Sequence, residues 1–521
     1  MRRRPFSAAA VTLAAALTAC VAGRSGAQPV QASAPQGNQE ASMQPAAQRA
    51  EATGGLPLAS VDDSEALAGA RKWRDGLRVD GAAPHGLELL GAGRFGAFRF
   101  THWRLGNGLQ IVLLPDPTAR LLAYHTFFRV GSAHEEIGHT GLAHLLEHLM
   151  FKGSKSYRAG TFDRVLERMG SSPNAATWLE WTMYHQTLLP EALAQVAAME
   201  ADRLLGLRLG KAGFESELDV VRSERREAVD NDPEGRLEEL FARMLWGQGV
   251  GYGHPTLGRA KDLRGATLAD VRAFYARWYQ PATATVVLAG ALEPAAALQT
   301  LVQAYGPLQT SVPAPALARV ATGALRGGQR EVSVDLGSER LLVGWRGLPG
   351  DHPDQAAVAL LAEVLGNADA ARWTHDLVDE TRLAADVDVD ALGLAGAGTF
   401  ELRVRLRPGK RAEDALARVD AILTSMLGDA PITEAELAAA RNRLRAERYA
   451  SLAGVDGRAE VLGVAVASFG DPRVAEAWWR RVEAVDLATL RRVATSLLRG
   501  TPRAVLIGRA RAATPAVEPR G

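Results

Sequence analysis

Two histidines and a glutamate lie close together in the segment His144-Leu-Leu-Glu147-His148. Residues three and four apart share one face of a helix, so both imidazoles could bind one metal ion with Glu147 beside them. This combination is typical of a zinc hydrolase, in which two neutral imidazoles hold the ion and the carboxylate deprotonates the attacking water. The alternative is a pair of surface histidines on an amphipathic helix. The inserted glutamate and the surrounding leucines favour the metal site.

A catalytic zinc ion has three protein ligands and one open position, so a third ligand is required. The segment 214–229 predicts a helix in which Glu217, Val220, Val221 and Glu224 share one face. Two carboxylates on an otherwise apolar stripe need an explanation, because burying an unpaired charge is costly. A zinc ion would supply one, although spacing alone does not decide between the two glutamates. The alternative is an exposed charged helix.

The elements that must position these residues alternate between strand-like and helix-like patterns from about residue 97 to 310. A Pro-rich stretch at 307–315 and a Gly-rich stretch at 323–328 indicate a connection, after which strands recur. These patterns predict a mixed α and β protein with two halves of similar style.

A predicted helix at 354–365 occupies the same place in the second half as the histidine-bearing helix in the first. Aligning Glu363 with Glu147 places Leu360 and Val364 opposite the two histidines. The second copy therefore keeps the apolar pattern and lacks the polar one. If the halves are duplicates, one is built for chemistry and the other for support.

Several motifs together resemble the pitrilysin/insulinase family of metallopeptidases, the inverzincins, and in particular bacterial members similar to the mitochondrial processing peptidase. The resemblance covers about residues 97 to 510. The motifs that carry it are Gly131-Ser132, Gly141 through Gly153, Asn174-Ala-Ala-Thr177, Asp202-Arg203 and the segment from Glu217 to Glu224.

The resemblance implies one zinc ion per chain, bound by His144, His148 and Glu224. It implies that Glu217 is an accessory acidic residue that orients a ligand or tunes its basicity. Glu147 would take a proton from the attacking water and later pass it to the leaving amine.

The resemblance also implies an α+β fold of two homologous α/β-sandwich domains that form a clamshell around a cleft. Substrate would lie extended along a sheet edge, in contact with Asn174 and the backbone of Ala175 and Ala176. Such binding reads backbone more than side chains. Unfolded protein segments or short peptides are therefore the expected substrates of a zinc metalloendopeptidase.

One departure from the family pattern bears on partners. Members that complete the active site within one chain carry an Arg and a Tyr in a segment resembling L-R-E-x-x-G-L-x-Y. The matching stretch here is 377–385, with Val378 and Ala385 at those two positions. The resemblance therefore implies a hetero-oligomer in which a second family member supplies the Arg/Tyr pair.

Two other functions fit parts of the sequence. One is a non-catalytic scaffold subunit similar to the family's core proteins, which the missing Arg/Tyr pair favours and the intact metal set with Glu147 disfavours. The other is a maturation protease dedicated to one peptide.

Composition excludes several function classes. The chain has 60 Lys plus Arg against 59 Asp plus Glu and no basic block, so a nucleic-acid partner is not expected. A single cysteine, Cys20, excludes an intramolecular disulfide framework and a cysteine-based zinc site.

The N-terminus predicts export. Arg2–Arg4 precede an apolar run of 13 residues, Ser7–Ala19, which is too short to span a bilayer. Leu17-Thr-Ala-Cys20 resembles the bacterial lipobox, which predicts lipidation of Cys20. We therefore expect a lipid anchor on the periplasmic side of a bacterial cell envelope, at the outer membrane. The alternative is signal cleavage after Ala27.

The predicted organisation follows from these boundaries. It comprises a signal peptide (1–19), the lipidated Cys20 with a flexible tether (20–54), an N-terminal extension (55–96), a zinc-bearing catalytic domain (97–311), a linker (312–328), an inactive homologous domain (329–511) and a tail (512–521).

Overall fold

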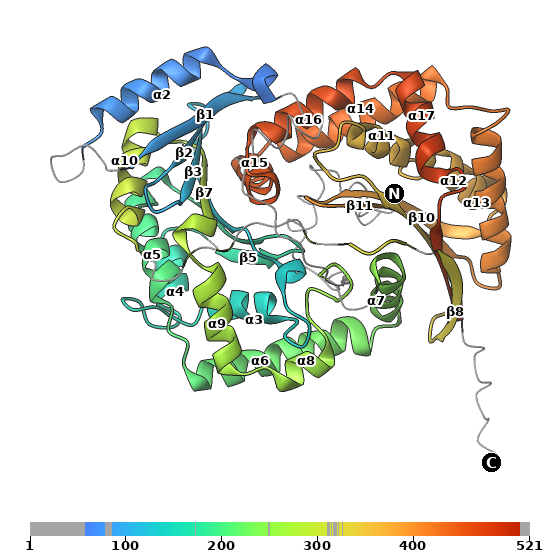
Figure 1. Ribbon diagram of the computed structural model, residues 1–521, viewed down its shortest axis with the longest axis horizontal. Coiled ribbons are helices and arrows are strands. Elements are labelled where there is room, and N and C mark those ends of the chain that lie inside the picture. The colour runs from blue at the N-terminus through green and yellow to red at the C-terminus, as the bar shows by residue number, and fades with distance from the viewer. Residues whose placement is uncertain are drawn as a thin grey trace.

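The computed structural model describes residues 58–510 except 79–85, 172, 248–250, 310–312, 314, 316–319, 321 and 326 (Figure 1). The predicted signal peptide, Cys20 with its tether, the tail and part of the linker (312, 314, 316–319, 321 and 326) lie outside the described residues. Within the described part, no helix combines the length and the apolar character that crossing a membrane requires.

The described strands form two sheets. The first has the order β1-β2-β3-β7-β4-β6-β5, with strands β1 (Glu88–Phe95), β2 (Phe98–Arg104), β3 (Gln110–Pro115), β4 (Leu122–Phe128), β5 (Asn174–Thr177), β6 (Thr182–Leu188) and β7 (Ala284–Gly290). The second has the order β10-β11-β9-β12-β8, with strands β8 (Gly328–Val334), β9 (Arg340–Gly347), β10 (Ala384–Gly393), β11 (Gly398–Leu406) and β12 (Arg503–Ala510).

Helices cover both sheets (Figure 1). Those of the first half are α2 (Ser64–Gly76), α3 (Leu142–Leu149), α4 (Thr161–Arg168), α5 (Leu193–Gly206), α6 (Lys211–Arg225), α7 (Pro233–Trp246), α8 (Ala260–Gly265), α9 (Leu268–Trp278) and α10 (Pro294–Tyr305). Those of the second half are α11 (Gln355–Leu365), α12 (Arg372–Thr374), α13 (Ala412–Met426), α14 (Glu434–Ser451), α15 (Val455–Phe469), α16 (Arg473–Ala484) and α17 (Leu487–Leu498). Short 3-10 or π turns are η1 (Leu58–Val61), η2 (Ser132–His134), η3 (Pro190–Ala192), η4 (Arg226–Asp230), η5 (Pro281–Thr283) and η6 (His375–Glu380).

The two sheets repeat one topology. In the first, β3 pairs in parallel with β7, and β4, β6 and β5 follow in antiparallel order. In the second, β8 pairs in parallel with β12, and β9, β11 and β10 follow in the same way. The predicted α+β fold of two homologous α/β-sandwich halves in a clamshell is therefore confirmed.

The first sheet has two additional strands, β1 and β2, beyond this shared topology. β1 lies within the segment 55–96 that the sequence assigns to an N-terminal extension, yet it pairs with β2 along its length. The extension is therefore an integral edge of the first sheet, because a hairpin turn at Gly96 returns the chain directly into β2.

Alternate residues of β4 face two different hydrophobic cores, as the period of a strand requires. Tyr124 and Phe128 pack in one core with the helices of the first half, including α3. Ala123 and Phe127 face the other side of the sheet and pack in a core shared with the second half. The first sheet is thus buried on both faces.

One helix of each half packs against the sheet of the other half. α15, from the second half, packs on β4 and β7, and α7, from the first half, packs on β12 and β9. Figure 1 shows α15 between the two halves. Glycines allow the close approach: a Cβ on Gly344 of β9 would lie 2.7 Å from Leu245, and one on Gly463 of α15 would lie 1.9 Å from Phe127.

Replacing Gly463 with Ala should therefore destabilise the protein. The added methyl group would overlap the Phe127 ring, and overpacking of this kind costs about 1–3 kcal/mol. Thermal unfolding should show a lower midpoint than in the wild type. Gly69→Ala is the matched control. Gly69 also lies within a helix, but a Cβ added there would be 3.8 Å from its nearest neighbour, Trp73, so this variant should not lower the midpoint. Equal midpoints for the two variants would contradict the tight packing of α15.

The second half uses the helix that matches α3 for packing alone. Every residue of α11 is buried, and Glu363, the counterpart of Glu147, has a fully buried side chain. Arg443 on α14 donates from Nε to the Glu363 carboxylate over 3.0 Å and from Nη2 to its backbone oxygen over 2.6 Å. At the position that matches Glu147, the second half therefore has a buried ion pair.

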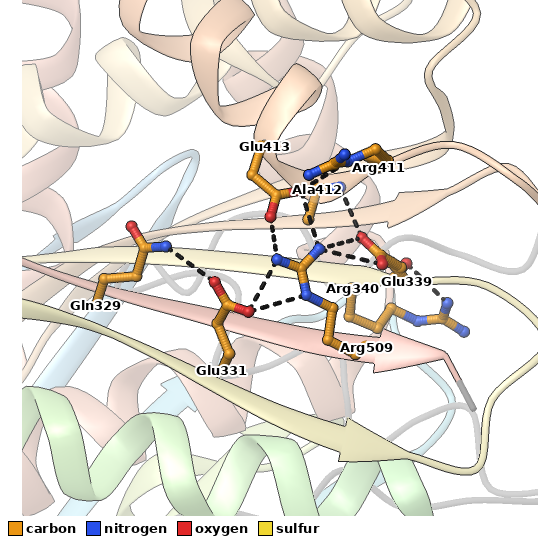
Figure 2. Close-up of polar contacts among 8 residues, drawn as sticks. All are labelled: Gln329, Glu331, Glu339, Arg340, Arg411, Ala412, Glu413 and Arg509. Atoms are coloured by element: carbon orange, nitrogen blue, oxygen red, sulfur yellow. Dashed lines mark hydrogen bonds and ion pairs between the residues drawn. The ribbon is translucent and has the colours of Figure 1, made fainter. Parts of the chain in front are cut away.

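Arg509, near the end of β12, links this strand to β8 and to α13 (Figure 2). Arg509 donates from Nε to Glu331 on β8 over 3.0 Å and from Nη1 to Glu339 over 3.1 Å. It also donates to Glu413 in the first turn of α13, over 2.9 Å from Nη1 to Oε2. This hydrogen bonding lowers the pKa of Glu413 to about 2, so the network is charged at neutral pH.

Candidate metal centre and active site

The helix α3 positions His144, Glu147 and His148. Its leucines are buried in the first core and leave the two histidines on the opposite, partly exposed face. The imidazole centroids lie 4.7 Å apart at 75°, as expected for residues one turn apart. Gly141 precedes the helix with φ 93°, a left-handed conformation that favours glycine.

Glu135 holds the start of α3 in place. Its carboxylate accepts hydrogen bonds from the amides of Gly141 and Ala143, each over 2.7 Å, and its side chain is fully buried. Burial raises the pKa of Glu135 to about 8, although the two amides act in the opposite direction. Sequence reasoning missed this residue, because a glutamate seven positions before the first residue of a helix is not a recognisable cap.

The helix α6 brings the third candidate ligand to the histidines. One ligand atom from each of His144, His148 and Glu224 lies within 4.8 Å of the others. Glu224 Oε2 is 3.8 Å from His144 Nε2 and 3.5 Å from His148 Nε2. The predicted ligand set is therefore assembled across two helices.

Glu217 lies on the other side of His148. Its Oε2 is 3.3 Å from His148 Nδ1, and its Oε1 is 2.7 Å from Lys152 Nζ. The nitrogen of His148 that faces Glu224 is thus distinct from the one that faces Glu217. Glu224 thus faces both histidines, whereas Glu217 contacts His148 and Lys152.

The predicted stripe on α6 needs one correction. Val221 is fully buried and Glu217 is 6% exposed, but Val220 is 40% exposed. The buried face runs through Phe214, Leu218 and Val221 instead. At 100° per residue, Val220 lies 100° to 160° around the helix from Phe214, Leu218 and Val221, so it points away from the buried face.

The donor set fits a zinc ion. Burial, and then the charge of His148, lower the pKa of His144 to about 3, so its imidazole is neutral, as a metal ligand must be. Two imidazoles and one carboxylate are a common zinc set in hydrolases. Glu217 beside His148 Nδ1 fixes the tautomer that leaves Nε2 free for a metal.

Glu147 is held beside the ligands by the edge strand. Thr177 Oγ1, at the end of β5, donates a hydrogen bond of 2.5 Å to Glu147 Oε2. Burial raises the pKa of Glu147 to about 6, while the bond from Thr177 lowers it. A carboxyl group with such a pKa can both accept and return a proton near neutral pH. No role was assigned to Thr177 from sequence, because the contact joins two distant segments.

The predicted substrate contacts Asn174, Ala175 and Ala176 all lie on β5. This strand is the edge of the first sheet and pairs with β6 alone among the described strands. Asn174 is exposed, and its side-chain oxygen accepts from the Ala175 amide over 2.9 Å. An edge strand can accept an added strand on its free side.

Val378 and Ala385, which stand where the family pattern has an Arg and a Tyr, lie in the second half. Val378 is in η6 and packs against the core, and Ala385 is exposed on β10, the edge strand of the second sheet. β10 corresponds in topology to β5.

Comparisons with known proteins agree with this fold. The family model for insulinase (peptidase family M16) matches residues 110–254, and the model for the peptidase M16 inactive domain matches residues 265–444. The chain belongs to this family, known as the pitrilysin/insulinase family.

Similar proteins include the zinc protease PqqE of Helicobacter pylori, 29% identical over 64% of this chain and 76% of that protein. The probable mitochondrial-processing peptidase subunit beta of Arabidopsis thaliana is 24% identical over 76% of this chain and 75% of its own length. A crystal structure of a protease from Helicobacter pylori has a TM-score of 0.74 and 25% identity, covering 79% of this chain and 99% of that one. A peptidase M16 inactive domain from Pseudomonas fluorescens, 17% identical, shares the fold with a TM-score of 0.71, over 80% of this chain and 98% of that one.

Proposed function

We propose that this protein is a zinc-dependent metalloendopeptidase that hydrolyses peptide bonds of unfolded proteins or short peptides. One observation carries the proposal: His144, His148 and Glu224 converge, with Glu147 of the same helix beside them and joined by Thr177 to an open sheet edge. A metal-ligand set, a base and a place for an extended chain thus lie together.

The residues of this chain divide the chemistry among them. His144, His148 and Glu224 would hold one zinc ion, which supplies Lewis acidity toward water and the scissile carbonyl. Glu147 accepts the proton of the attacking water and returns it to the leaving amine. Thr177 keeps the Glu147 carboxylate oriented while it does so.

The edge strand β5 supports the proposed substrate class. A peptide added beside Asn174, Ala175 and Ala176 would form main-chain hydrogen bonds that do not depend on its side chains. Folded proteins rarely offer a free extended segment, so unfolded chains and short peptides fit this edge best.

The direct test is cleavage of an unstructured peptide by the full chain, with zinc content measured in the same sample. Cleavage that disappears with a zinc chelator and returns with added zinc supports the proposal. Stoichiometric zinc without cleavage, in the presence and absence of a partner subunit, would favour the scaffold function. Cleavage restricted to one peptide would favour the dedicated maturation protease.

We further propose that the active form is a hetero-oligomer. Val378 and Ala385 stand where the family pattern has an Arg and a Tyr that hold the substrate and the developing oxyanion. The Arabidopsis relative is named as one subunit of a processing peptidase. One chain in a structure of complex III from Candida albicans shares the fold with a TM-score of 0.67 and 14% identity, over 78% of this chain and 95% of that one.

Mixing the chain with a family member that carries the Arg/Tyr pair and lacks the zinc motif should raise cleavage by about 10²–10³-fold, the usual effect of an oxyanion-stabilising group. Peptide turnover with increasing amounts of the second subunit measures it. The same subunit with its Arg and Tyr replaced is the control. Full turnover by the isolated chain would contradict this arrangement.

We also propose that the protein is lipid-anchored through Cys20 on the periplasmic side of a cell envelope. The lipoproteins that this N-terminus resembles carry three acyl chains on the cysteine, which is more than stable membrane attachment requires. Cys20→Ala should release or mislocalise the protein while its zinc content stays that of the wild type, because the described metal ligands are histidine and glutamate side chains. Membrane fractionation measures the change, and unchanged membrane association would contradict lipidation.

A further inference from the structure

A second cluster of metal-ligating side chains lies on the face of the first sheet that is turned away from α3. His125 on β4 and His185 on β6 are directly opposed in the antiparallel register. Their imidazole centroids are 5.3 Å apart, and His125 Nε2 is 2.9 Å from Asp456 Oδ1. Asp456 stands in the first turn of α15, so the cluster draws on both halves.

We propose that His125, His185 and Asp456 form a second divalent metal site, suited to zinc, that clamps α15 of the second half onto the first sheet. One nitrogen of each imidazole and one oxygen of Asp456 all lie within 4.8 Å of one another. The set formed by His144, His148 and Glu224 meets the same limit.

Unpaired nitrogens in the cluster point to a missing ligand. His125 is 1% exposed, and its Nδ1 has no hydrogen-bond partner among the described residues. The buried Nε2 of His185 likewise has none in this part of the chain. A hydrogen bond between His125 and Asp456 alone leaves His185 unexplained, because buried polar atoms in folded proteins nearly always have a partner. A cation coordinated by all three residues explains their convergence.

The cluster also has an open side. His185 and Asp456 line a cavity of about 490 Å³, with Met169, Thr187 and Leu188 among its other walls. The Asp456 side chain is 48% exposed. An ion could therefore enter from solvent and keep a position for water, as a site with three protein ligands does.

The position of the cluster gives it a consequence for the fold. His185 is directly opposed to Asn174 on β5, the strand proposed to receive substrate. A metal bound by residues of β4, β6 and α15 would hold the second half against the sheet next to that strand. Ligands that bind only the folded arrangement stabilise it. Metal loading would thus fix how the two halves sit beside the substrate edge.

Zinc stoichiometry of the full chain tests the proposal without reference to peptide cleavage. Apo protein is titrated with zinc against a chromogenic chelator, and bound zinc is counted by elemental analysis. The wild type should bind two equivalents per chain, and His185→Leu and Asp456→Asn one each. Glu224→Gln should also bind one, and zinc should still raise its thermal midpoint. The double variant Glu224→Gln/His185→Leu should bind none, and zinc should leave its midpoint unchanged.

A wild type that binds one equivalent, lost in Glu224→Gln, would overturn the second site and leave the cluster a hydrogen-bonded contact. Asp456→Asn keeps the test valid if His185→Leu does not fold, because the half-exposed amide can still hydrogen-bond to His125. A wild type that binds one equivalent, lost in His185→Leu and kept in Glu224→Gln, would instead support the second site and contradict the peptidase site. Failure of the two proposals is therefore distinguishable.

Discussion

Glu147→Gln is expected to lower the kcat of peptide cleavage by about 10²–10⁴-fold and to leave zinc content unchanged. The amide has the shape of the carboxylate and can still accept the hydrogen bond from Thr177, so α3 keeps its position. It cannot take a proton from water. The change therefore removes proton transfer and little else. Peptide turnover at saturating substrate, with zinc measured on the same sample, checks it.

The second half provides a matched control for this variant. Glu363 occupies the position of Glu147 in the repeated topology but is paired with Arg443. Glu363→Gln should leave kcat at the wild-type value and lower the thermal midpoint, because it weakens a buried ion pair. If Glu147→Gln retained wild-type turnover, the proton-transfer role of Glu147 would be wrong.

Glu224→Gln is expected to lose one equivalent of zinc per chain and, with it, peptide cleavage. Glu224 is the carboxylate between His144 Nε2 and His148 Nε2, at 3.8 and 3.5 Å. A neutral amide is a much weaker zinc ligand than a carboxylate, and two imidazoles alone do not make a tight site. Zinc counting and peptide turnover measure the two effects.

Glu217→Gln separates the two glutamates of α6. Glu217 contacts His148 Nδ1 and Lys152, so it would act on a metal bound at His148 through that imidazole. Its replacement should weaken zinc binding by about 10–100-fold and leave the stoichiometry unchanged at saturating zinc. If Glu217→Gln lost the zinc and Glu224→Gln kept it, the assignment of the third ligand would be reversed.

Local spacing carried most of what the sequence could predict. The face shared by His144, Glu147 and His148 follows from the helical period, and α3 places all three on one partly buried face. The two halves could be recognised because each repeats the same order of strands and helices. The choice of Glu224 over Glu217 came from the family resemblance, and the structure brings Glu224 to both histidines.

Contacts between distant segments could not be read from spacing. Thr177 and Glu147 are 30 residues apart, and His125 and Asp456 are 331 apart. The same holds for the cap that Glu135 provides to α3 and for the exposure of Val220, which depends on what packs against α6. No periodic pattern in one segment reports which other segment will lie beside it.

The sequence by itself therefore determined the candidate metal-binding helix, its candidate base and the duplicated architecture, because a helix or strand expresses its periodicity within a few residues. Only the tertiary structure decided which half lends a helix to which sheet, how the edge strand orients Glu147, and that His125, His185 and Asp456 meet. The physical reason is that packing brings together side chains whose positions along the chain are unrelated. Gly463 and Phe127, for example, come into close contact only because α15 packs on β4.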